Sequence, residues 1–318
     1  MILITGGLGF IGSHTARALV ELGESCVLTQ RRAPEPNALL ADQIGKRVFL
    51  EQVDVADAEA LIEVCERHQV TGIIHLAGAF FGDPIEDARA NLNMLFSVVN
   101  AARATGIGRV CIASTIGVYD IGDEGALSES LRLPISAGHG IPMSKKINEL
   151  LISQLAPATG IELYAARIGA IWGPLGRPAA PFFPTSQLIH AAAAGRELDL
   201  ATVDGGRMPY AGDGLDLMYV RECGRALAML QLADKLNHRV YNVASGRITT
   251  NGEIVEAIAA TLPEAQFDLP AGHDPEGRRS ASWLDTTRLH EDTGFELEYD
   301  TERAVADYLG WLRAGNER

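Results

Sequence analysis

The stretch MILITGGLGFIG (residues 1–12) decides the predicted fold of this chain. Its short apolar run, Ile2–Ile4, is typical of a buried strand and ends at Thr5. Glycines follow, and from Ser13 to Leu22 apolar residues recur at helical spacing until Gly23. The stretch therefore predicts a strand, a glycine turn and a helix.

The glycines of this turn are Gly6, Gly9 and Gly12. Amides at the start of a helix are unpaired and the helix dipole favours negative charge there, so this end binds phosphate groups. We expect Gly6 to make the tight turn, Gly9 to let the backbone approach a diphosphate, and Gly12 to let the helix pack against the strand. The pattern predicts a dinucleotide site that includes Phe10 and Ile11. The alternative is an ordinary glycine-rich turn.

The composition of the 318-residue chain indicates one large α/β domain, or a large and a small one. Hydrophobic residues make up 47% and charged residues 21%, which suffices for a core and excludes a disordered chain. The net charge of −14 argues against a nucleic-acid or anionic-membrane partner. Met1 leads directly into the first strand and no apolar run has the length of a membrane span, so we expect a soluble, cytoplasmic protein.

Cysteine and histidine give no sign of a metal site. The eight histidines show no ligand spacing with one another or with cysteine, so we predict no metal. Without a Cys-x-x-Cys pair, the cysteines are expected to be reduced thiols, most of them buried. They are Cys26, Cys65, Cys111 and Cys223.

Predicted strands and helices alternate from Ile2 to about Ala113. The expected strands after the first are 25–29, 48–53, 72–76 and 109–113, and the expected helices are 58–68 and 85–105. This alternation predicts an α/β fold with a doubly wound parallel sheet covered on both faces. Further along, 162–168 and 239–243 are expected to be strands, and 186–194, 251–262 and 301–312 helices.

The second strand is followed by Gln30, Arg31 and Arg32. An acidic residue here would accept hydrogen bonds from the adenosine ribose and repel a 2′-phosphate, whereas arginines attract that phosphate. We therefore favour NADP over NAD. The alternative is that both arginines are solvated loop charges and Gln30 serves NAD through its amide.

Other strand ends carry further candidate cofactor contacts, because doubly wound folds bind ligands at the carboxyl edge of the sheet. A carboxylate at Asp54 can accept from the adenine amino group, with Val55 as an apolar wall. Small residues after the fourth strand, at Ala77 and Gly78, let a cofactor pass over the sheet edge. The candidates at strand ends are Asp54, Val55, Leu76, Ala77, Gly78 and Ile168, and Asn91 in the predicted helix 85–105 is a further one.

Eight motifs in this order resemble the extended short-chain dehydrogenase/reductase family, the NAD(P)-dependent epimerase/dehydratases. They cover essentially the whole chain. They are TGGLGFIG from Thr5, DVAD from Asp54, HLAG from His75, NLNMLFSVVNAAR from Asn91, IASTIGVYD from Ile112, ARIGAIWGP from Ala166, YNVASG from Tyr241 and DTTRLHEDTGF from Asp285.

The resemblance implies a Rossmann domain over residues 1–171 and a smaller, mainly substrate-binding α/β domain over 172–318, with about 210–250 crossing back. Thr115 matches the family's catalytic Ser/Thr, whose hydroxyl hydrogen-bonds the substrate oxygen; its alternative role is a local cap. Ala77 to Ala79 would lie at the nicotinamide-side ribose. The resemblance also implies a homodimer through helices that include the one starting near Pro142.

The family's acid/base, a tyrosine four residues before a lysine, is missing. Aligning SKKINELL on the family helix puts Lys145 in the lysine place and Ile141 in the tyrosine place. An isoleucine cannot exchange a proton. His139 is one replacement, because its ordinary pKa suits a general base, and an exposed loop histidine is the alternative. Tyr119 is a second replacement, and Lys145 would still bind the ribose.

The substrate position also departs from the family. Members that act on nucleotide sugars carry an arginine where counting back from Tyr219–Val220 places Leu215. Arg207, Arg278 or Arg279 would compensate, or would be surface charges. The aromatic residues Phe80, Phe81, Trp172, Phe182 and Phe183 would line an apolar pocket, or belong to the core.

The leading hypothesis is an NAD(P)-dependent epimerase/dehydratase-type enzyme. It would act on a hydroxyl or carbonyl carbon of a sugar-like or other small polar substrate, with a non-standard acid/base. Two alternatives share the fold: a dinucleotide-binding regulatory or structural protein without redox turnover, and a non-redox lyase or isomerase.

Overall fold

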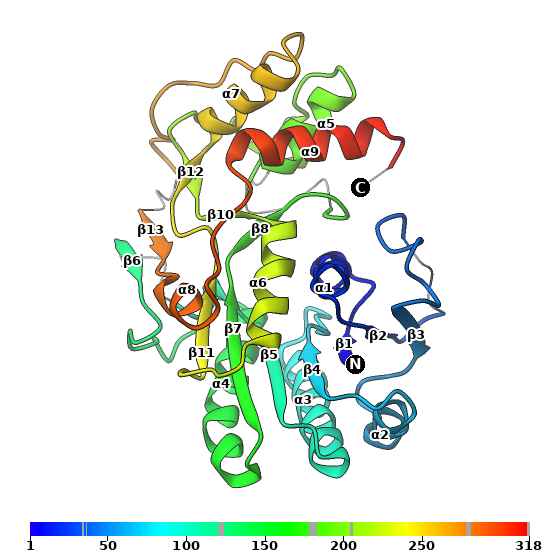
Figure 1. Cartoon of the computed structure of the whole chain (residues 1–318). Helices are drawn as coiled ribbons and strands as arrows, with labels where there is room; N and C mark the ends of the chain where they lie inside the picture. The colour runs from blue at the N-terminus through cyan, green and yellow to red at the C-terminus, as the bar shows by residue number, and fades with distance from the viewer. Residues whose placement is uncertain are drawn as a thin grey trace.

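A seven-stranded parallel sheet lies at the centre of the N-terminal part of the chain (Figure 1). The computed structural model describes residues 1–33, 35, 37–119, 124–177, 183–203, 206–277 and 281–316. In the strand order β11-β7-β5-β4-β1-β2-β3, β1 lies between β4 and β2. Strands β2 and β3 follow it on one side, and the later strands are added on the other side, which confirms the predicted doubly wound sheet. The strands are β1 (Ile2–Thr5), β2 (Cys26–Gln30), β3 (Val48–Gln52), β4 (Gly72–His75), β5 (Arg109–Thr115), β7 (Glu162–Ile168) and β11 (Val240–Val243).

Alternate residues of the strands serve two separate hydrophobic cores. On one face, Ile2 and Ile4 pack with side chains of α1 (Phe10–Glu21) and α6 (Val220–Leu232). On the other face, Leu3 packs with α2, α3 and α4. These helices are α2 (Ala58–Arg67), α3 (Pro84–Thr105) and α4 (Gly140–Thr159). Both faces of the sheet are therefore covered, as a parallel sheet requires.

A smaller group of elements lies beyond the carboxyl end of the sheet, at the top of Figure 1. Helices α5 (Thr185–Ala193), α7 (Asn251–Thr261) and α9 (Thr301–Arg313) share a third core around Trp172, Ile258 and Tyr308. Short strands join these helices to the sheet, and the division of the chain at residue 171 stays a prediction. The remaining elements are η1 (Ile116–Val118), β6 (Gly125–Leu127), β8 (Ala170–Trp172), η2 (Leu200–Thr202), β9 (Gly214–Leu215), β10 (Leu217–Tyr219), β12 (Thr249–Thr250), β13 (Ser282–Leu284) and α8 (Thr287–Thr293).

The structure corrects two expectations about helices. The predicted start of the first helix at Ser13 was wrong, because α1 begins at Phe10 and therefore includes Gly12. Helix α6 was not predicted. It has Gly224 in its interior, where a Cβ atom would lie 2.5 Å from the backbone carbonyl carbon of His14. The glycine that weakens the helical pattern is thus the residue that lets α6 approach α1 closely.

Within the described ranges, no helix is both long enough and apolar enough to cross a membrane. The same residues contain no cluster of three or more His, Cys, Asp or Glu side chains arranged for a metal ion. All four cysteines are free and buried.

Candidate active site

The glycine turn after β1 leaves the start of α1 open. Gly6 has φ +69°, which only glycine adopts without strain, and its carbonyl accepts a hydrogen bond of 2.9 Å from the Gly9 amide. Gly9 is the N-cap of α1 and no side chain caps this end. The first amides of α1, at Phe10 and Ile11, are therefore available to an anionic group.

Close backbone contacts explain the glycines of this turn. A Cβ atom on Gly12 would lie 2.5 Å from the Gly6 oxygen and 2.8 Å from the Gly7 Cα. Gly12 was expected to pack against the strand, and this was wrong: its contact is with the turn. The strand contact belongs to Gly7, where a Cβ atom would lie 2.7 Å from the Leu28 Cβ. The sequence signal for a close contact at Gly7 was that it directly follows Gly6.

The loop after β4 meets the glycine turn across the crevice of the sheet. Leu76 donates a backbone hydrogen bond of 3.2 Å to Thr5, and the Ala77 nitrogen lies 3.1 Å from the Cβ position of Gly6. The Thr5 hydroxyl lies 2.7 Å from Nδ1 of His75, whose pKa burial lowers to about 3. The structure thus brings these predicted cofactor contacts together.

Asn91 holds the same loop from α3. Its Oδ1 accepts from the Ala79 amide at 3.2 Å, and its Nδ2 donates to the carbonyls of Ala79 and Asp87, each at 2.7 Å. The Asp87 carboxylate accepts from the Phe81 amide at 2.5 Å. Asn91 was predicted as a cofactor contact. In the structure its side-chain amide bonds to the backbone and holds the loop beside Gly78 in shape.

The ends of β2 and β3 lie side by side, joined by a 3.0 Å hydrogen bond from the Val53 amide to the Gln30 carbonyl. Gln30 Oε1 is buried and has no hydrogen-bond partner within the described ranges. Arg31 and Arg32 are exposed. These groups, an orphaned acceptor and two nearby cations, fit the adenosine end of a dinucleotide. Val55 is buried close by, and exposed Asp54 accepts from the Ala56 amide at 3.0 Å.

Thr115 ends β5, and α4 begins against it. The Thr115 hydroxyl accepts from the Gly117 amide at 3.2 Å, and the ring of Pro142 lies 2.9 Å from the Cβ position of Gly117. Ile168 is the register partner of Thr115 on β7. Lys145 is only 8% exposed, and burial lowers the pKa of its amine to about 8.

A family model, the NAD dependent epimerase/dehydratase family, matches residues 2–244, which is most of the chain. The chain belongs to this family. It is 27% identical to the UDP-glucose 4-epimerase of Neisseria gonorrhoeae, over 98% of this chain and 97% of that protein. It is also 27% identical to the dTDP-glucose 4,6-dehydratase of Streptomyces griseus, over 98% and 93%.

Solved structures show the same fold. The UDP-glucose 4-epimerase of Thermotoga maritima, solved with UDP-glucose, superposes with a TM-score of 0.81 at 20% identity, covering 99% of both chains. The UDP-N-acetylglucosamine 4-epimerase of Methanobrevibacter ruminantium gives 0.82 at 21% identity, covering 99% of this chain and 98% of that one. The family match makes the protein an NAD(P)-dependent epimerase/dehydratase-type enzyme, and the solved structures show its fold.

This family enzyme has Ile141 in the first turn of α4, one turn before Lys145. His139 is exposed, stands as the N-cap of α4, and caps nothing with its side chain. Tyr119 is 4% exposed: its hydroxyl donates to Asn242 Oδ1 at 2.7 Å and accepts from Arg167 at 2.8 Å. Burial raises the pKa of Tyr119 despite that arginine. Tyr119 is thus a buried structural residue.

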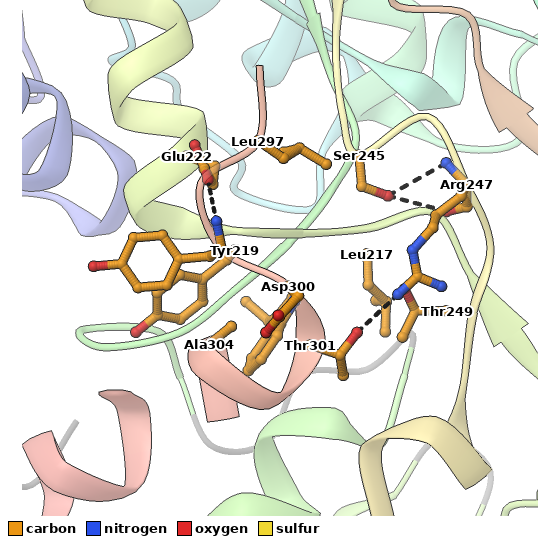
Figure 2. Close-up of a pocket in the computed structure, with 12 residues that line it drawn as sticks. Leu217, Tyr219, Glu222, Ser245, Arg247, Thr249, Leu297, Asp300, Thr301 and Ala304 are labelled. Carbon is orange, nitrogen blue, oxygen red and sulfur yellow. Dashed lines mark hydrogen bonds between the residues drawn. The ribbon is translucent and has the colours of Figure 1, made fainter. Parts of the chain in front are cut away.

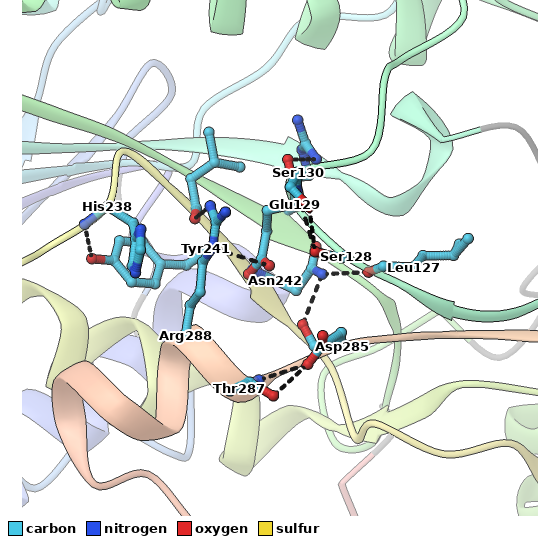
Figure 3. Close-up of polar contacts among 12 residues, drawn as sticks. Leu127, Ser128, Glu129, Ser130, His238, Tyr241, Asn242, Asp285, Thr287 and Arg288 are labelled. Carbon is cyan, nitrogen blue, oxygen red and sulfur yellow. Dashed lines mark hydrogen bonds and ion pairs between the residues drawn. The ribbon is translucent and has the colours of Figure 1, made fainter.

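A buried polar network that the sequence did not predict lies next to Thr115, at the end of β5. Arg167 forms an ion pair of 2.7 Å with Glu149, whose carboxylate also accepts from the Ser114 hydroxyl at 2.5 Å. Figure 3 shows the other end, where Asn242 donates to the carbonyls of Leu127 and Asp285, each at 2.8 Å. The network ties β5, β7 and β11 together. The only sequence signal for this network is that polar residues stand within strand and helix patterns whose neighbours are apolar.

The residues expected to hold the substrate are spread over several elements. Leu215 pairs with Thr249 in a short antiparallel ladder and packs on the core of α5, α7 and α9. Arg207 is exposed and forms ion pairs of 3.4 Å with Asp274 and Glu276. Arg278, Arg279 and Phe182 lie outside the described residues. Trp172 and Phe183 belong to the C-terminal core. Phe80 and Phe81 are 45% and 61% exposed, and the Phe80 ring lies 3.1 Å from the Cβ position of Gly78.

A separate cavity of about 230 Å³ lies between α6, α9 and the segment after β11 (Figure 2). It contains none of the predicted site residues except Trp172. Arg247, on its wall, donates to Thr301 and forms an ion pair of 2.8 Å with Glu253. Glu222 accepts from the Tyr299 amide at 2.7 Å. These polar groups pair with one another, so the cavity gives no sign of a second active site.

Proposed function

We propose that this enzyme binds NAD(P) across the β1–β4 crevice and transfers hydride at a hydroxyl- or carbonyl-bearing carbon of a sugar nucleotide. One observation carries the proposal: the uncapped start of α1, the loop after β4, and Thr115 beside α4 all lie at the carboxyl edge of one sheet. Relatives named as UDP-glucose epimerases and a dTDP-glucose dehydratase support the substrate class.

Each predicted residue has a role in this proposal. A bound nicotinamide supplies the hydride acceptor and donor. The amides of α1 hold the diphosphate, and Lys145 contacts the ribose next to the nicotinamide. The Thr115 hydroxyl donates a hydrogen bond to the substrate oxygen, whose charge changes during the reaction. His139 is the sequence-based candidate for moving the proton.

A panel of carbonyl and hydroxyl compounds tests the function. We would incubate the protein and dinucleotide with UDP-glucose, UDP-galactose and dTDP-glucose, and follow reduced nicotinamide absorbance and product sugars by NMR. Thr115→Ala should lower turnover by about 10²–10³-fold, since it removes a donor to the reacting oxygen, and Thr115→Ser should retain most of it. Dinucleotide binding without turnover of any compound would contradict the proposal.

A second substrate class is favoured by Leu215. A leucine packed on the C-terminal core cannot pair with a diphosphate, and exposed Phe80 and Phe81 provide apolar surface near Gly78. Under this alternative the substrate is a smaller, partly aromatic hydroxyl or carbonyl compound. Turnover of such compounds, with none of the UDP or dTDP sugars, would select it.

We propose NADP as the preferred cofactor, because Arg31 and Arg32 are exposed cations at the end of β2. The buried Gln30 Oε1 favours the competing choice, since the 2′-hydroxyl of NAD can donate to it and a phosphate cannot. Titration with both dinucleotides separates the two. The double variant Arg31→Ala/Arg32→Ala should weaken NADP binding about 10–100-fold and leave NAD binding unchanged; equal loss for both would contradict an NADP preference.

We propose a homodimer through α3 and α4. Phe96 on α3 is 44% exposed and Leu150 on α4 is 69% exposed, and the two helices pack on each other. A second copy would cover this apolar surface. Sedimentation should give a dimer for the wild type and a monomer for Phe96→Asp/Leu150→Asp. A monomeric wild type at micromolar concentration would contradict the proposal.

A further inference from the structure

The inward face of α4 carries a lysine with no partner. Lys145 is more than nine-tenths buried. In the part of the chain that the structure describes, neither a carboxylate nor a hydrogen-bond partner acts on its amine. Beside it on the helix, Ser144 Oγ and Asn148 Oδ1 are also buried and unpaired. Polar groups left in this state are costly unless a bound molecule completes them. This face therefore points to a site of contact with substrate or cofactor.

The first turn of α4 lies against Thr115. Pro142 packs on Gly117, in the turn whose amide the Thr115 hydroxyl accepts. Ile141 stands one helical turn before Lys145, so both project from the same side of α4. The lysine therefore occupies the same side of the helix as the position where the family has its proton-exchanging tyrosine.

Other titratable groups near this turn are already engaged. Tyr119 is bonded to Arg167 and Asn242, and Glu149 to Arg167 and Ser114. The Lys146 ammonium donates to the carbonyls of Pro134 and Ser136. His139 has an exposed side chain on the solvent side of the N-cap.

We propose that the Lys145 amine itself exchanges the proton with the substrate hydroxyl, in place of the absent tyrosine. This rests on the proposed hydride-transfer function. In the oxidation direction, the carbon gives its hydride to the oxidised nicotinamide, the hydroxyl proton passes to the neutral amine to give an ammonium, and a carbonyl forms. In the reverse direction, the ammonium returns the proton as the hydride comes back. Thr115 donates a hydrogen bond to the oxygen in both directions.

The surroundings of Lys145 suit this exchange. Burial lowers its pKa to about 8, so neutral and charged forms are both populated near neutral pH. The groups that act on it are the Cys111 thiol of β5 and the His75 imidazole of β4, and both are fully buried and uncharged at this pH. Asp87 of α3 is bonded to the Phe81 amide, and Glu149 of α4 is paired with Arg167. None of these carboxylates forms an ion pair with Lys145.

Lysine labelling tests the proposal without a substrate. The chain has four lysines, Lys46, Lys145, Lys146 and Lys235, so trace acetylation at a series of pH values can be followed at each site by peptide mass spectrometry. We expect Lys145 to half-titrate near pH 8, well below the ordinary lysine pKa of about 10.4. Half-titration of Lys145 above about pH 10 would overturn the proposal whether or not a substrate is known.

Turnover with UDP-galactose is the second measurement, with dinucleotide affinity measured separately. Lys145→Arg keeps a cation for the ribose but cannot release a proton near neutral pH, so turnover should fall about 10²–10⁴-fold with affinity within about tenfold. Adding Ile141→Tyr should restore part of that turnover, and the control Lys235→Arg should match the wild type. Turnover of Lys145→Arg within fivefold of wild type, or an equal loss in His139→Ala, would overturn the proposal. A wild type that binds dinucleotide and turns nothing over would instead refute the proposed function.

Discussion

Replacing Gly12 by alanine tests the turn on which the dinucleotide site depends. The added Cβ atom would lie 2.5 Å from the Gly6 oxygen and 2.8 Å from the Gly7 Cα. Both neighbours are backbone atoms of a tight turn, so neither can rotate away. Overpacking of this kind costs about 1–3 kcal/mol of unfolding free energy. Because the turn must open to relieve the contact, the first amides of α1 move away from their positions, and we expect dinucleotide affinity to fall at least about tenfold, which corresponds to about 1.4 kcal/mol.

The measurement for Gly12→Ala combines urea unfolding, followed by tryptophan fluorescence, with titration of NADH and NADPH. Gly310→Ala is the matched control: Gly310 lies inside α9, and no atom comes within 4 Å of its Cβ position. That substitution should raise the unfolding free energy by about 0.5–1 kcal/mol and leave dinucleotide affinity unchanged. If Gly12→Ala, like Gly310→Ala, neither lowers the unfolding free energy nor weakens dinucleotide binding, the dinucleotide site does not depend on the close approach of α1 to the turn.

Three further predictions concern the buried network and the stability of the protein in acid. Tyr119→Phe should lower the unfolding free energy by about 1–3 kcal/mol, because Arg167 and Asn242 lose a buried partner, yet keep turnover within a few-fold; a large loss of turnover would make Tyr119 the acid/base. Arg167→Met should cost about 3–5 kcal/mol by leaving the Glu149 carboxylate unpaired, and Glu149→Met/Arg167→Met should recover part of that loss in urea unfolding; additive losses would mean that the pair is not coupled. Burial lowers the pKa of His14 from 6.5 to about 4, so the unfolded chain takes up a proton that the folded chain excludes. Stability should therefore be lost as the pH falls from 6.5 to about 4, and His14→Gln should flatten that slope in unfolding measured across this range; an unchanged slope would assign the acid loss to other groups.

The parallel sheet could be predicted because its determinants are local. Each buried strand is a short apolar run, and each of α2 and α3 begins at an aspartate cap, Asp57 or Asp83, that the sequence places just before the helical pattern. Helix α6 could not be predicted in this way. Its interior Gly224 argues against a helix locally, and the reason for it is a contact with His14, more than two hundred residues away.

The candidate site also has a part that could be predicted from the sequence and a part that could not. The glycine turn could be found from its spacing after a strand pattern, and Thr115 and the missing tyrosine at Ile141 could be found from the resemblance to the family's motifs. The partners of Asn91 and Tyr119 could not, since they depend on which backbone and side-chain groups the fold leaves unpaired. Asn91 uses its amide on Ala79, and Tyr119 is bonded in the interior.

The frame of the site and its proton-exchanging group are separable in this enzyme. Ser114 adjoins Thr115 on β5, and its hydroxyl bonds to Glu149, which Arg167 pairs from β7. This network holds the end of β5 and involves neither Ile141 nor Lys145. An exchange of tyrosine for isoleucine therefore leaves Thr115 held as before and removes only the phenol. On the inward face of α4, Ser144 Oγ, Asn148 Oδ1 and the Lys145 amine have no partner within the described residues. Of these three groups only the amine can exchange a proton near neutral pH, which is why we assign the proposed proton transfer to Lys145.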